Sequence, residues 1–395
     1  MIPYGHQDIS QADIDAVTAV LRSDFLTQGP TIPRFEAAVA ARVKARHAVA
    51  STSATSALHL ACMALGLGQG DVLWTVPNTF VASANCARYC GADVDFVDID
   101  AVTWNLSVPA LAAKLAEAQR GDQLPQVLVP VHFSGQPTEQ EEIWKLAQLY
   151  GVKVIEDASH SIGGARNGEP VGSCRWSDIT VFSFHPVKII TTGEGGMALT
   201  NDAQLAERMA MLRTHGITRD AASFTAVSEI APDAAPPSWY YEQQMLGFNY
   251  RMTDIQAVLG MSQLQRLDAY VARRNELARR YDVALRGLPL RLPSIQPANL
   301  SAFHLYVVRL QASAAGVTHR QVFDRMRQMG VGVNLHYIPV HLQPYYRALG
   351  FAPGQFPEAE AHGREAITLP LFAGLTEAEQ DRVVDCLHQA LGAVT

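Results

Sequence analysis

The sequence predicts an α/β fold in which a large domain is built on a mainly parallel sheet and a smaller α+β domain follows it. Two observations lead to this prediction. Between residues 47 and 200, short runs rich in aliphatic and β-branched residues alternate with helical stretches. Runs as continuously apolar as Val127-Leu128-Val129-Pro130-Val131 indicate strands that are covered on both faces, which is typical of parallel sheets flanked by helices.

Seven strands are expected in the large domain, each followed by a turn or a helical stretch. In chain order they are His47–Ser51, Val72–Val76, Val94–Val97, Val127–Phe133, Val152–Asp157, Ile179–Phe184 and Gly196–Thr200. The Ala/Pro-rich stretch Ala221–Pro237 that comes later has the composition of a surface loop or excursion, and it need not be a linker.

A helical pattern with few breakers runs from Thr253 to about Leu285 and is longer than an average helix. We expect it to link a large domain of residues 1–255 to a smaller domain of residues 256–395. The smaller domain should contain a strand and two helices, at Phe303–Leu310, Arg320–Met329 and Glu377–Leu391.

The composition is that of an enzyme-sized globular chain, with 395 residues, 48% hydrophobic and 17% charged. A net charge of -7 gives no basic surface for nucleic acid, and no run approaches the roughly 18 apolar residues of a membrane span. The amino terminus lacks the basic start and apolar stretch of a signal peptide, so we expect a cytoplasmic protein. The five cysteines show no zinc-type spacing, so no metal is expected and Cys86 and Cys90 are interpreted as small core residues.

Two strand ends carry residues with distinctive chemistry. Lys188 follows the expected strand Ile179–Phe184 and precedes the turn Gly193–Gly196. A lysine in this position is a candidate Schiff-base former, because desolvation lowers the pKa of its amine. Asp157 ends another strand. Together they predict pyridoxal 5′-phosphate: the lysine would hold the aldehyde carbon, and the aspartate would keep the pyridine nitrogen protonated so that the ring acts as an electron sink.

Hydroxyl side chains near two of the strands are candidates for binding the cofactor phosphate. Thr55 and Ser56 lie where a strand and a small-residue turn lead into a helix, and a helix start favours anions. Ser183 lies five residues before Lys188 and could give the phosphate a further bond. The plainer interpretations are that Ser53 or Thr55 merely caps the helix and that Ser183 is a buried, backbone-satisfied hydroxyl.

Two ring-bearing residues could contact the pyridine ring. Phe80 follows a strand and could stack on it, whereas a core phenylalanine is the plainer interpretation. His160 could bond the ring hydroxyl or orient Asp157, and otherwise would be an ordinary loop histidine. The order of all these residues along the chain favours a cofactor site. No GxGxxG motif follows a strand, which disfavours a nicotinamide cofactor.

Over essentially its whole length the chain resembles the DegT-type sugar aminotransferases, which have the aspartate aminotransferase fold (fold type I). The matching segments are Leu26–Pro30, Ser53–Leu58, Pro77–Ala82, Glu156–Ala158, Phe182–Lys188, Gly193–Gly196, Gly247–Asp254 and His336–His341. The resemblance implies a transaminase that uses pyridoxal phosphate and an amino-acid donor, L-glutamate. Lys188 and Asp157 are then its catalytic residues.

Within that family, Trp239–Gln244 and His185–Thr192 are most similar to the UDP-4-amino-4,6-dideoxy-N-acetyl-β-L-altrosamine transaminases of pseudaminic acid synthesis. This implies amination at C4 of a UDP-linked 4-keto-6-deoxy N-acetyl amino sugar. The alternatives are a dTDP- or GDP-linked 4-keto sugar or UDP-4-keto-arabinose as substrate. A sugar 3-dehydrase of the same fold would lack Lys188, and a non-catalytic sugar-binding or regulatory protein would not need both Lys188 and Asp157.

The resemblance further implies that Asn249 reaches the cofactor phosphate of a partner subunit, so that the active unit is a homodimer with shared sites. From the sequence alone, the plainer interpretation of Asn249 is an asparagine that ends a turn before the long helix. The resemblance also implies that loops from both ends of the chain hold the nucleotide sugar, although each residue could instead be a surface-loop or core position. These residues are Tyr4, Asp24, Phe25, Leu26, Thr27, Ala54, His185, His336, Tyr337, Ile338 and Pro339.

Overall fold

The computed structural model describes residues 1–226 and 235–392. Its centre is a seven-stranded sheet in the order β1-β9-β8-β5-β4-β2-β3, to which all seven expected strands belong. Strands from β8 to β3 pair in parallel, whereas β9 is antiparallel to both of its neighbours. The bounds are β1 His47–Ser51, β2 Val72–Thr75, β3 Asp93–Phe96, β4 Val127–Val129, β5 Lys153–Asp157, β8 Ile179–Ser183 and β9 Gly196–Thr200. The predicted α/β class with a mainly parallel sheet is confirmed.

Strand β4 is shorter than the sequence suggested, because it stops at Val129 and not at Phe133. Pro130 has no N–H to donate to the ladder, so the regular pairing ends there. Val131 still forms an isolated parallel bridge with Asp157. The chain therefore stays beside the end of β5, where Asp157 lies.

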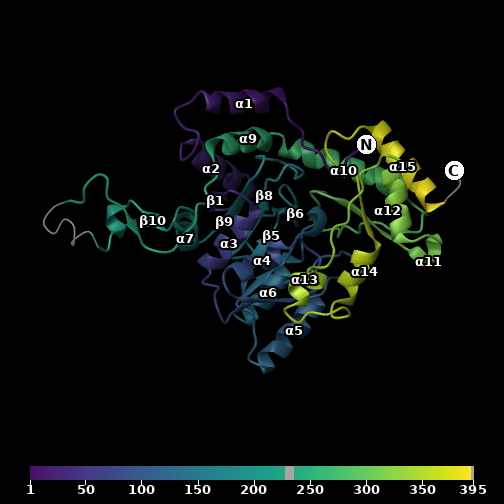
Figure 1. Ribbon diagram of the computed structural model, residues 1–395, viewed down its shortest axis with the longest axis horizontal. Coiled ribbons are helices and arrows are strands. Elements are labelled where there is room, and N and C mark those ends of the chain that lie inside the picture. Colours follow the sequence, from purple (N-terminus) through teal and green to yellow (C-terminus); the bar gives the residue numbers. More distant parts are fainter. Residues whose placement is uncertain (227–234, 393–395) are drawn as a thin grey trace.

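Helices cover the sheet and extend beyond it (Figure 1). Helix α2 packs between β1 and α9, and α1 lies on the outer side of α9. The α-helices are α1 Gln11–Leu21, α2 Thr31–Val43, α3 Ala54–Ala64, α4 Ala82–Tyr89, α5 Val108–Arg120, α6 Gln140–Leu149, α7 Ala203–Arg213, α9 Asp254–Leu264, α10 Leu267–Ala284, α11 Ala312–Ala315, α12 His319–Gln328, α13 Pro344–Arg347, α14 Pro357–Glu365 and α15 Glu377–Leu391. In the described part of the chain, 3-10 turns lie at η1 Phe133–Gly135, η2 Ala221–Ser223 and η3 Val340–Leu342.

The helical pattern expected over Thr253–Leu285 forms two consecutive helices, α9 and α10, and not one long helix. Thr253 starts α9 with a capping box completed by Gln256. At the junction Arg266 leaves helical geometry, with φ -102° and ψ 4°, and its guanidinium pairs with Asp8 and Asp13 of the amino-terminal segment. The break between α9 and α10 thus lies at the residue whose ion pairs hold the amino-terminal segment.

The carboxyl-terminal part has a hydrophobic core of its own, in which Tyr281 of α10, Val308 of β14 and Leu387 of α15 are buried together. Its sheet has the order β12-β14-β15, with bounds Leu290–Arg291, Tyr306–Leu310 and Ala366–Leu369. A second small sheet joins β13 Asn299–Leu300 to β6 Ala165–Arg166 and β7 Glu169–Pro170. The boundary at residue 255 stays a prediction.

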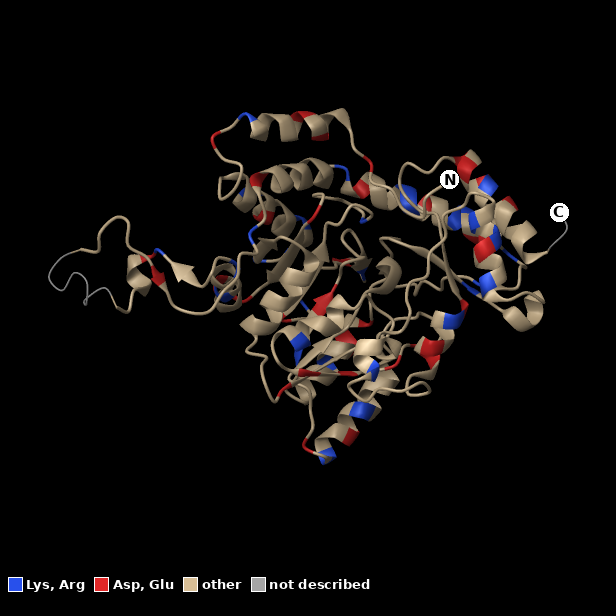
Figure 2. Ribbon diagram, viewed as in Figure 1, with Lys and Arg blue, Asp and Glu red and all other residues tan. Residues whose placement is uncertain are grey.

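An arm projects from the body of the molecule at the left of Figure 1 and carries the ribbon of β10 Ile217–Thr218 and β11 Glu242–Gln243. The described residues of the expected excursion Ala221–Pro237 belong to this arm, and residues 227–234 lie outside the described residues. Most of the described part of this arm is tan in Figure 2, so few of its residues are charged. No helix in the described part of the chain is long and apolar enough to cross a membrane.

Candidate active site

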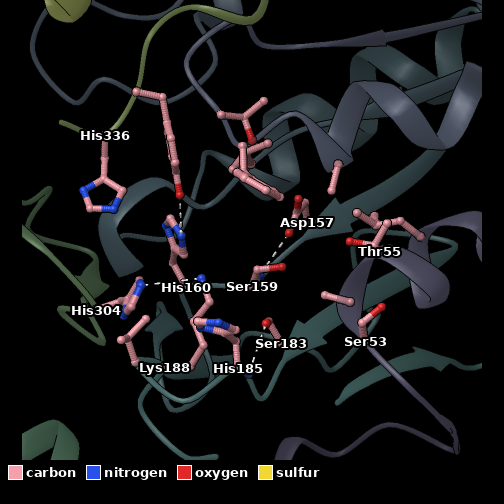
Figure 3. Close-up of a pocket in the computed structure, with 18 of the residues that line it drawn as sticks. Ser53, Thr55, Asp157, Ser159, His160, Ser183, His185, Lys188, His304 and His336 are labelled. Carbon is pink, nitrogen blue, oxygen red and sulfur yellow. Dashed lines mark hydrogen bonds between the residues drawn. The ribbon is translucent and has the colours of Figure 1, made fainter. Parts of the chain in front are cut away.

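A cavity of about 450 Å³ lies at one edge of the central sheet, where β1, β2, β5 and β8 end. These strands point the same way, because β1 and β8 are both antiparallel to β9 and the others are parallel to β8. The carboxyl ends of parallel strands are the usual ligand-binding edge of an α/β sheet. The segments that follow these strands line the cavity (Figure 3).

Lys188 lines the cavity from the loop after β8. Burial lowers the pKa of its amine to about 8, and the charge of Asp157 offsets part of that effect. Its Nζ lies 3.5 Å from Nε2 of His304, on the segment before β14. An amine with a lowered pKa is partly neutral near pH 7 and is therefore a better nucleophile than an ordinary lysine.

Asp157 ends β5 with a buried carboxylate that faces the same cavity. Both of its oxygens accept a hydrogen bond. The Ser83 hydroxyl donates to Oδ2 at 2.6 Å, and the Ser159 amide donates to Oδ1 at 3.1 Å. A carboxylate held in this way has a fixed direction and can pair with a protonated ring nitrogen.

The neighbouring carboxylate, Glu156, faces away from the cavity, because successive side chains of a strand point to opposite faces. Gln140 and Thr180 donate to it at 2.6 and 2.9 Å, and Nε2 of His132 lies 3.4 Å away. These contacts outweigh the effect of burial and hold the pKa of Glu156 below its usual range. Glu156 is thus a structural carboxylate.

The amino terminus of α3 forms the opposite wall of the cavity, with Ser53, Ala54 and Thr55 in the lining. The amides at the start of a helix have no carbonyl partner within it, so they favour an anion. Gly196 of β9 permits this approach, because a Cβ there would collide with the backbone of Ser53 and Ala54. Thr55 is therefore placed where the predicted phosphate site requires it.

Ser56 is placed differently from Thr55. Its hydroxyl donates to the carbonyl oxygen of Ser53 at 2.8 Å and also accepts from the Ser53 amide, which completes a capping box. Ser56 is not among the residues that line the cavity. The helix-cap interpretation holds for Ser53, which is the N-cap of α3, and a bond from the Ser56 side chain to the phosphate stays a prediction. Ser183 lines the cavity, and its bond to the phosphate also stays a prediction.

Phe80 and His160 both line the cavity. Phe80 is 58% exposed, so it is not a core residue and its ring face is available for stacking. His160 is buried: its Nδ1 accepts from the Ser134 amide at 3.2 Å, so Nε2 carries the proton and donates to the Tyr337 hydroxyl, also at 3.2 Å. Burial, followed by the charge of Lys188, holds the pKa of His160 well below its usual range.

The residues predicted to hold the sugar fall into two groups. The first lines the cavity and consists of Tyr4, Ala54, His185, His336 and Tyr337. Burial lowers the pKa of His336 to about 3, so its ring is neutral. The second group does not line the cavity: Asp24, Phe25, Leu26, Thr27, Ile338 and Pro339.

Asn249 also lies outside the cavity and is exposed. Asn249 forms a bridge with Thr214, whereas Thr27 forms a bridge with Thr253 and the Asp254 amide donates to the Leu26 carbonyl at 2.9 Å. The roles of Asn249 and of residues 24–27 stay predictions.

Sequence reasoning missed several residues of the site, and the reason differs among them. Ser159 could have been found, because an aspartate commonly accepts from the amide two residues on. Ser83 and His304 had no local signal. They reach Asp157 and Lys188 from elements 74 and 116 residues away in the sequence.

Comparison with known proteins adds independent information on the whole chain. The profile of the DegT/DnrJ/EryC1/StrS aminotransferase family matches residues 7–388. The spore coat polysaccharide biosynthesis protein SpsC of Bacillus subtilis is 36% identical over 390 residues, which are 98% of this chain and 96% of that protein.

Solved structures share the fold over its full length. PseC of Helicobacter pylori, an aminotransferase involved in the biosynthesis of pseudoaminic acid, superposes with a TM-score of 0.88 at 27% identity, covering 100% of both chains. Spr1654 of Streptococcus pneumoniae in its PMP-form gives the same TM-score, identity and coverage. The fold type I architecture predicted for this chain is thereby confirmed.

Proposed function

The chain belongs to the DegT/DnrJ/EryC1/StrS aminotransferase family, and on that premise we propose that it transfers an amino group from L-glutamate to C4 of a UDP-linked 4-keto-6-deoxy N-acetyl amino sugar. The observation that carries the proposal is the cavity in which Lys188, Asp157 and the start of α3 meet. Its amine, its buried carboxylate and its anion-binding helix terminus are the three groups that a transaminase needs around its cofactor.

The cofactor is pyridoxal 5′-phosphate, and the residues of the cavity fit it. The amino terminus of α3 with Thr55 and Ser183 would bind the phosphate, Phe80 would stack on the ring, and the Asp157 carboxylate would pair with the ring nitrogen. His160, neutral and held by Ser134 and Tyr337, would contact the ring or orient Asp157. When bound, the cofactor supplies an electron sink that stabilises negative charge on the carbon next to the transferred nitrogen.

Lys188 has two tasks in this scheme. Its amine would hold the aldehyde carbon of the cofactor and, when free, would move the proton from Cα of glutamate to C4′ of the cofactor. In the second half of the cycle the same amine would move a proton in the opposite direction, to C4 of the sugar. A base whose pKa is about 8 suits both directions near neutral pH.

The substrate class is supported by the lining of the cavity and by the relatives. Tyr4, His185, His336 and Tyr337 offer aromatic faces and polar atoms to a sugar nucleotide. PseC is named as an aminotransferase involved in the biosynthesis of pseudoaminic acid, and SpsC as a spore coat polysaccharide biosynthesis protein. We place the reaction in the cytoplasm, before export of the product, on a pathway to a pseudaminic-type nonulosonic acid.

The test is to incubate the protein with glutamate and a panel of UDP-, dTDP- and GDP-linked 4-keto-6-deoxy sugars, with UDP-4-keto-arabinose included, and to compare kcat/KM by mass detection of the amino sugars. We expect the UDP-linked N-acetyl amino sugar to be preferred by at least on the order of tenfold, because polar groups left unpaired by a wrong sugar cost more than a missing methyl group. A preference for a dTDP- or GDP-linked sugar would reject this substrate but not the transaminase.

The active unit in this proposal is a homodimer in which each cavity is completed by the partner. Asn249 and residues 24–27 are exposed and do not line the cavity of their own chain, and Phe25 and Leu26 expose 51% and 47% of their surface. Exposed large hydrophobic side chains of this kind mark association surfaces. A second copy would cover them and bring Asn249 to the phosphate in its cavity.

Mixing two inactive variants tests the shared site. Lys188→Ala and a disabling Asn249→Ala variant should each be inactive, whereas a heterodimer has one site with both residues intact. Random exchange should restore about a quarter of the wild-type activity, since half of the dimers are mixed and each has one working site. Differently tagged subunits show whether exchange has occurred, and no recovery after proven exchange would exclude sharing through Asn249.

A further inference from the structure

A buried chain of hydroxyl groups ends on the carboxylate of Asp157. Ser83, on the first turn of α4, is fully buried and does not line the cavity. Its Oγ lies 2.6 Å from Oδ2 of Asp157 and 2.8 Å from Oγ1 of Thr79. Thr79 is also buried, and it does line the cavity.

The direction of these hydrogen bonds follows from the chemistry of the groups. An ionised carboxylate only accepts, so the Ser83 hydroxyl donates to Asp157. The contact of the same hydroxyl with the Phe80 carbonyl is long, at 3.4 Å, and cannot compete with a bond of 2.6 Å for one proton. Because the Ser83 proton is used, Thr79 must donate to Ser83. Each bond polarises the next, which strengthens the donor that faces the carboxylate.

The carboxylate is thus held at both ends. Ser83 binds Oδ2 from α4, and the Ser159 amide binds Oδ1 from the loop after β5. The terminal torsion of an aspartate is broad when nothing restrains it. With two donors in place, the plane of the carboxylate is fixed and its remaining lone pairs keep a constant direction toward the cavity.

We propose that Ser83, with Thr79 behind it, is a positioning residue that holds the Asp157 carboxylate in the plane of the cofactor ring; this inference depends on the proposed function. The segment Thr79–Ser83 would then provide two different interactions that act on the cofactor ring. Phe80 presents its exposed face for stacking, and Ser83 fixes the group that stabilises the charge on the ring nitrogen. Both effects arise from one turn at the start of α4, so stacking and charge pairing keep a constant geometry relative to each other.

Three variants test the proposal. Ser83→Ala removes the donor, Ser83→Thr keeps a hydroxyl, and Ser161→Ala is the matched control. Ser161 is as fully buried as Ser83 and also has a side-chain hydrogen bond, to the His132 carbonyl at 3.3 Å, but it does not contact Asp157. Any loss caused only by removing a buried hydroxyl should appear equally in Ser83→Ala and Ser161→Ala.

Three measurements are made on each protein: the Kd of pyridoxal phosphate from fluorescence titration of the apo-protein, the ¹⁵N shift of the ring nitrogen of bound labelled cofactor, and kcat and KM for the sugar. Ser83→Ala should raise Kd, move the ¹⁵N shift and lower kcat roughly ten- to hundredfold with KM nearly unchanged, as expected for loss of a bond to a charged group. Ser83→Thr should recover most of kcat and of the ¹⁵N shift.

Two outcomes would overturn the inference. If Ser83→Ala matches Ser161→Ala in Kd, ¹⁵N shift and kcat, Ser83 only fills the core. If the wild-type protein binds no pyridoxal phosphate, the proposed function fails and this inference fails with it, which the Kd measurement detects before any variant is made. Should Ser83→Ala not fold, Ser83→Cys takes its place with the same expectation, because a thiol has a similar size but is a weak donor.

Discussion

The Lys188→Ala protein is expected to fold normally, to bind pyridoxal phosphate only reversibly and to lose on the order of 10³-fold or more in turnover. The reason is that one amine both binds the cofactor and moves the proton, and no second amine lines the cavity among the described residues. Borohydride reduction followed by peptide mapping identifies the lysine that carries the cofactor. The wild-type protein should carry the cofactor on the peptide that contains Lys188, and the variant should carry none.

Lys153→Ala is the matched control for this experiment. Lys153 lies at the start of β5, its side chain is 49% exposed, and its Nζ pairs with Asp178 at 3.1 Å. An exposed ion pair contributes little to stability, so this variant should keep its fold, activity and cofactor label. A label on Lys153 in the wild-type protein would mean that Lys188 is not the residue that binds the cofactor.

The lowered pKa of Lys188 gives a second check on the same residue. In the apo-protein its amine titrates at about 8 instead of 10.5, so its rate of labelling by an amine reagent should rise through half-maximum near pH 8. Between these two values the unfolded chain binds more protons than the folded one. The contribution of Lys188 to stability therefore rises with pH across this window, and the rise should be missing from Lys188→Ala.

The residues that the sequence alone could identify are those whose position follows from local structure. Lys188 and Asp157 follow apolar strands, and the carboxyl ends of parallel strands meet at one edge of the sheet, so their proximity could be predicted. That Thr55 lies at a helix start after a strand could be predicted for a similar reason, and it lines the cavity, while its bond to the phosphate stays a prediction. These three residues needed no knowledge of contacts between distant segments.

Other features depend on tertiary contacts or on a competing local pattern. Ser56 was predicted to bind the phosphate, which stays a prediction, whereas the capping box that its hydroxyl forms with Ser53 was not foreseen. The long helix was predicted from periodicity, whereas Arg266 breaks it while pairing with Asp8 and Asp13. Periodicity shows which residues favour a helix, but it does not show where a contact with another segment interrupts it.

Among variants that keep Lys188, Asp157→Ala is expected to lose the most activity. Its kcat should fall on the order of 10²- to 10³-fold, and its fold should be retained. Without this carboxylate the ring nitrogen loses the charge that keeps it protonated, and the ring becomes a weaker electron sink. Single-turnover kinetics with glutamate and the ¹⁵N shift of the bound cofactor are the measurements. Circular dichroism and the Tm show whether the fold is retained.

Glu156 is the only other carboxylate on β5, and its environment explains why it should not rescue Asp157→Ala. It points to the opposite face of the sheet, where Gln140, Thr180 and His132 hold it in a fully buried network. Rotation toward the cavity would leave those groups unpaired, which is costly in a buried site. Glu156→Gln should therefore lower the Tm while kcat stays close to that of the wild type. If Asp157→Ala kept substantial turnover with bound cofactor, and adding Glu156→Gln abolished it, Glu156 would be the acid that serves the ring.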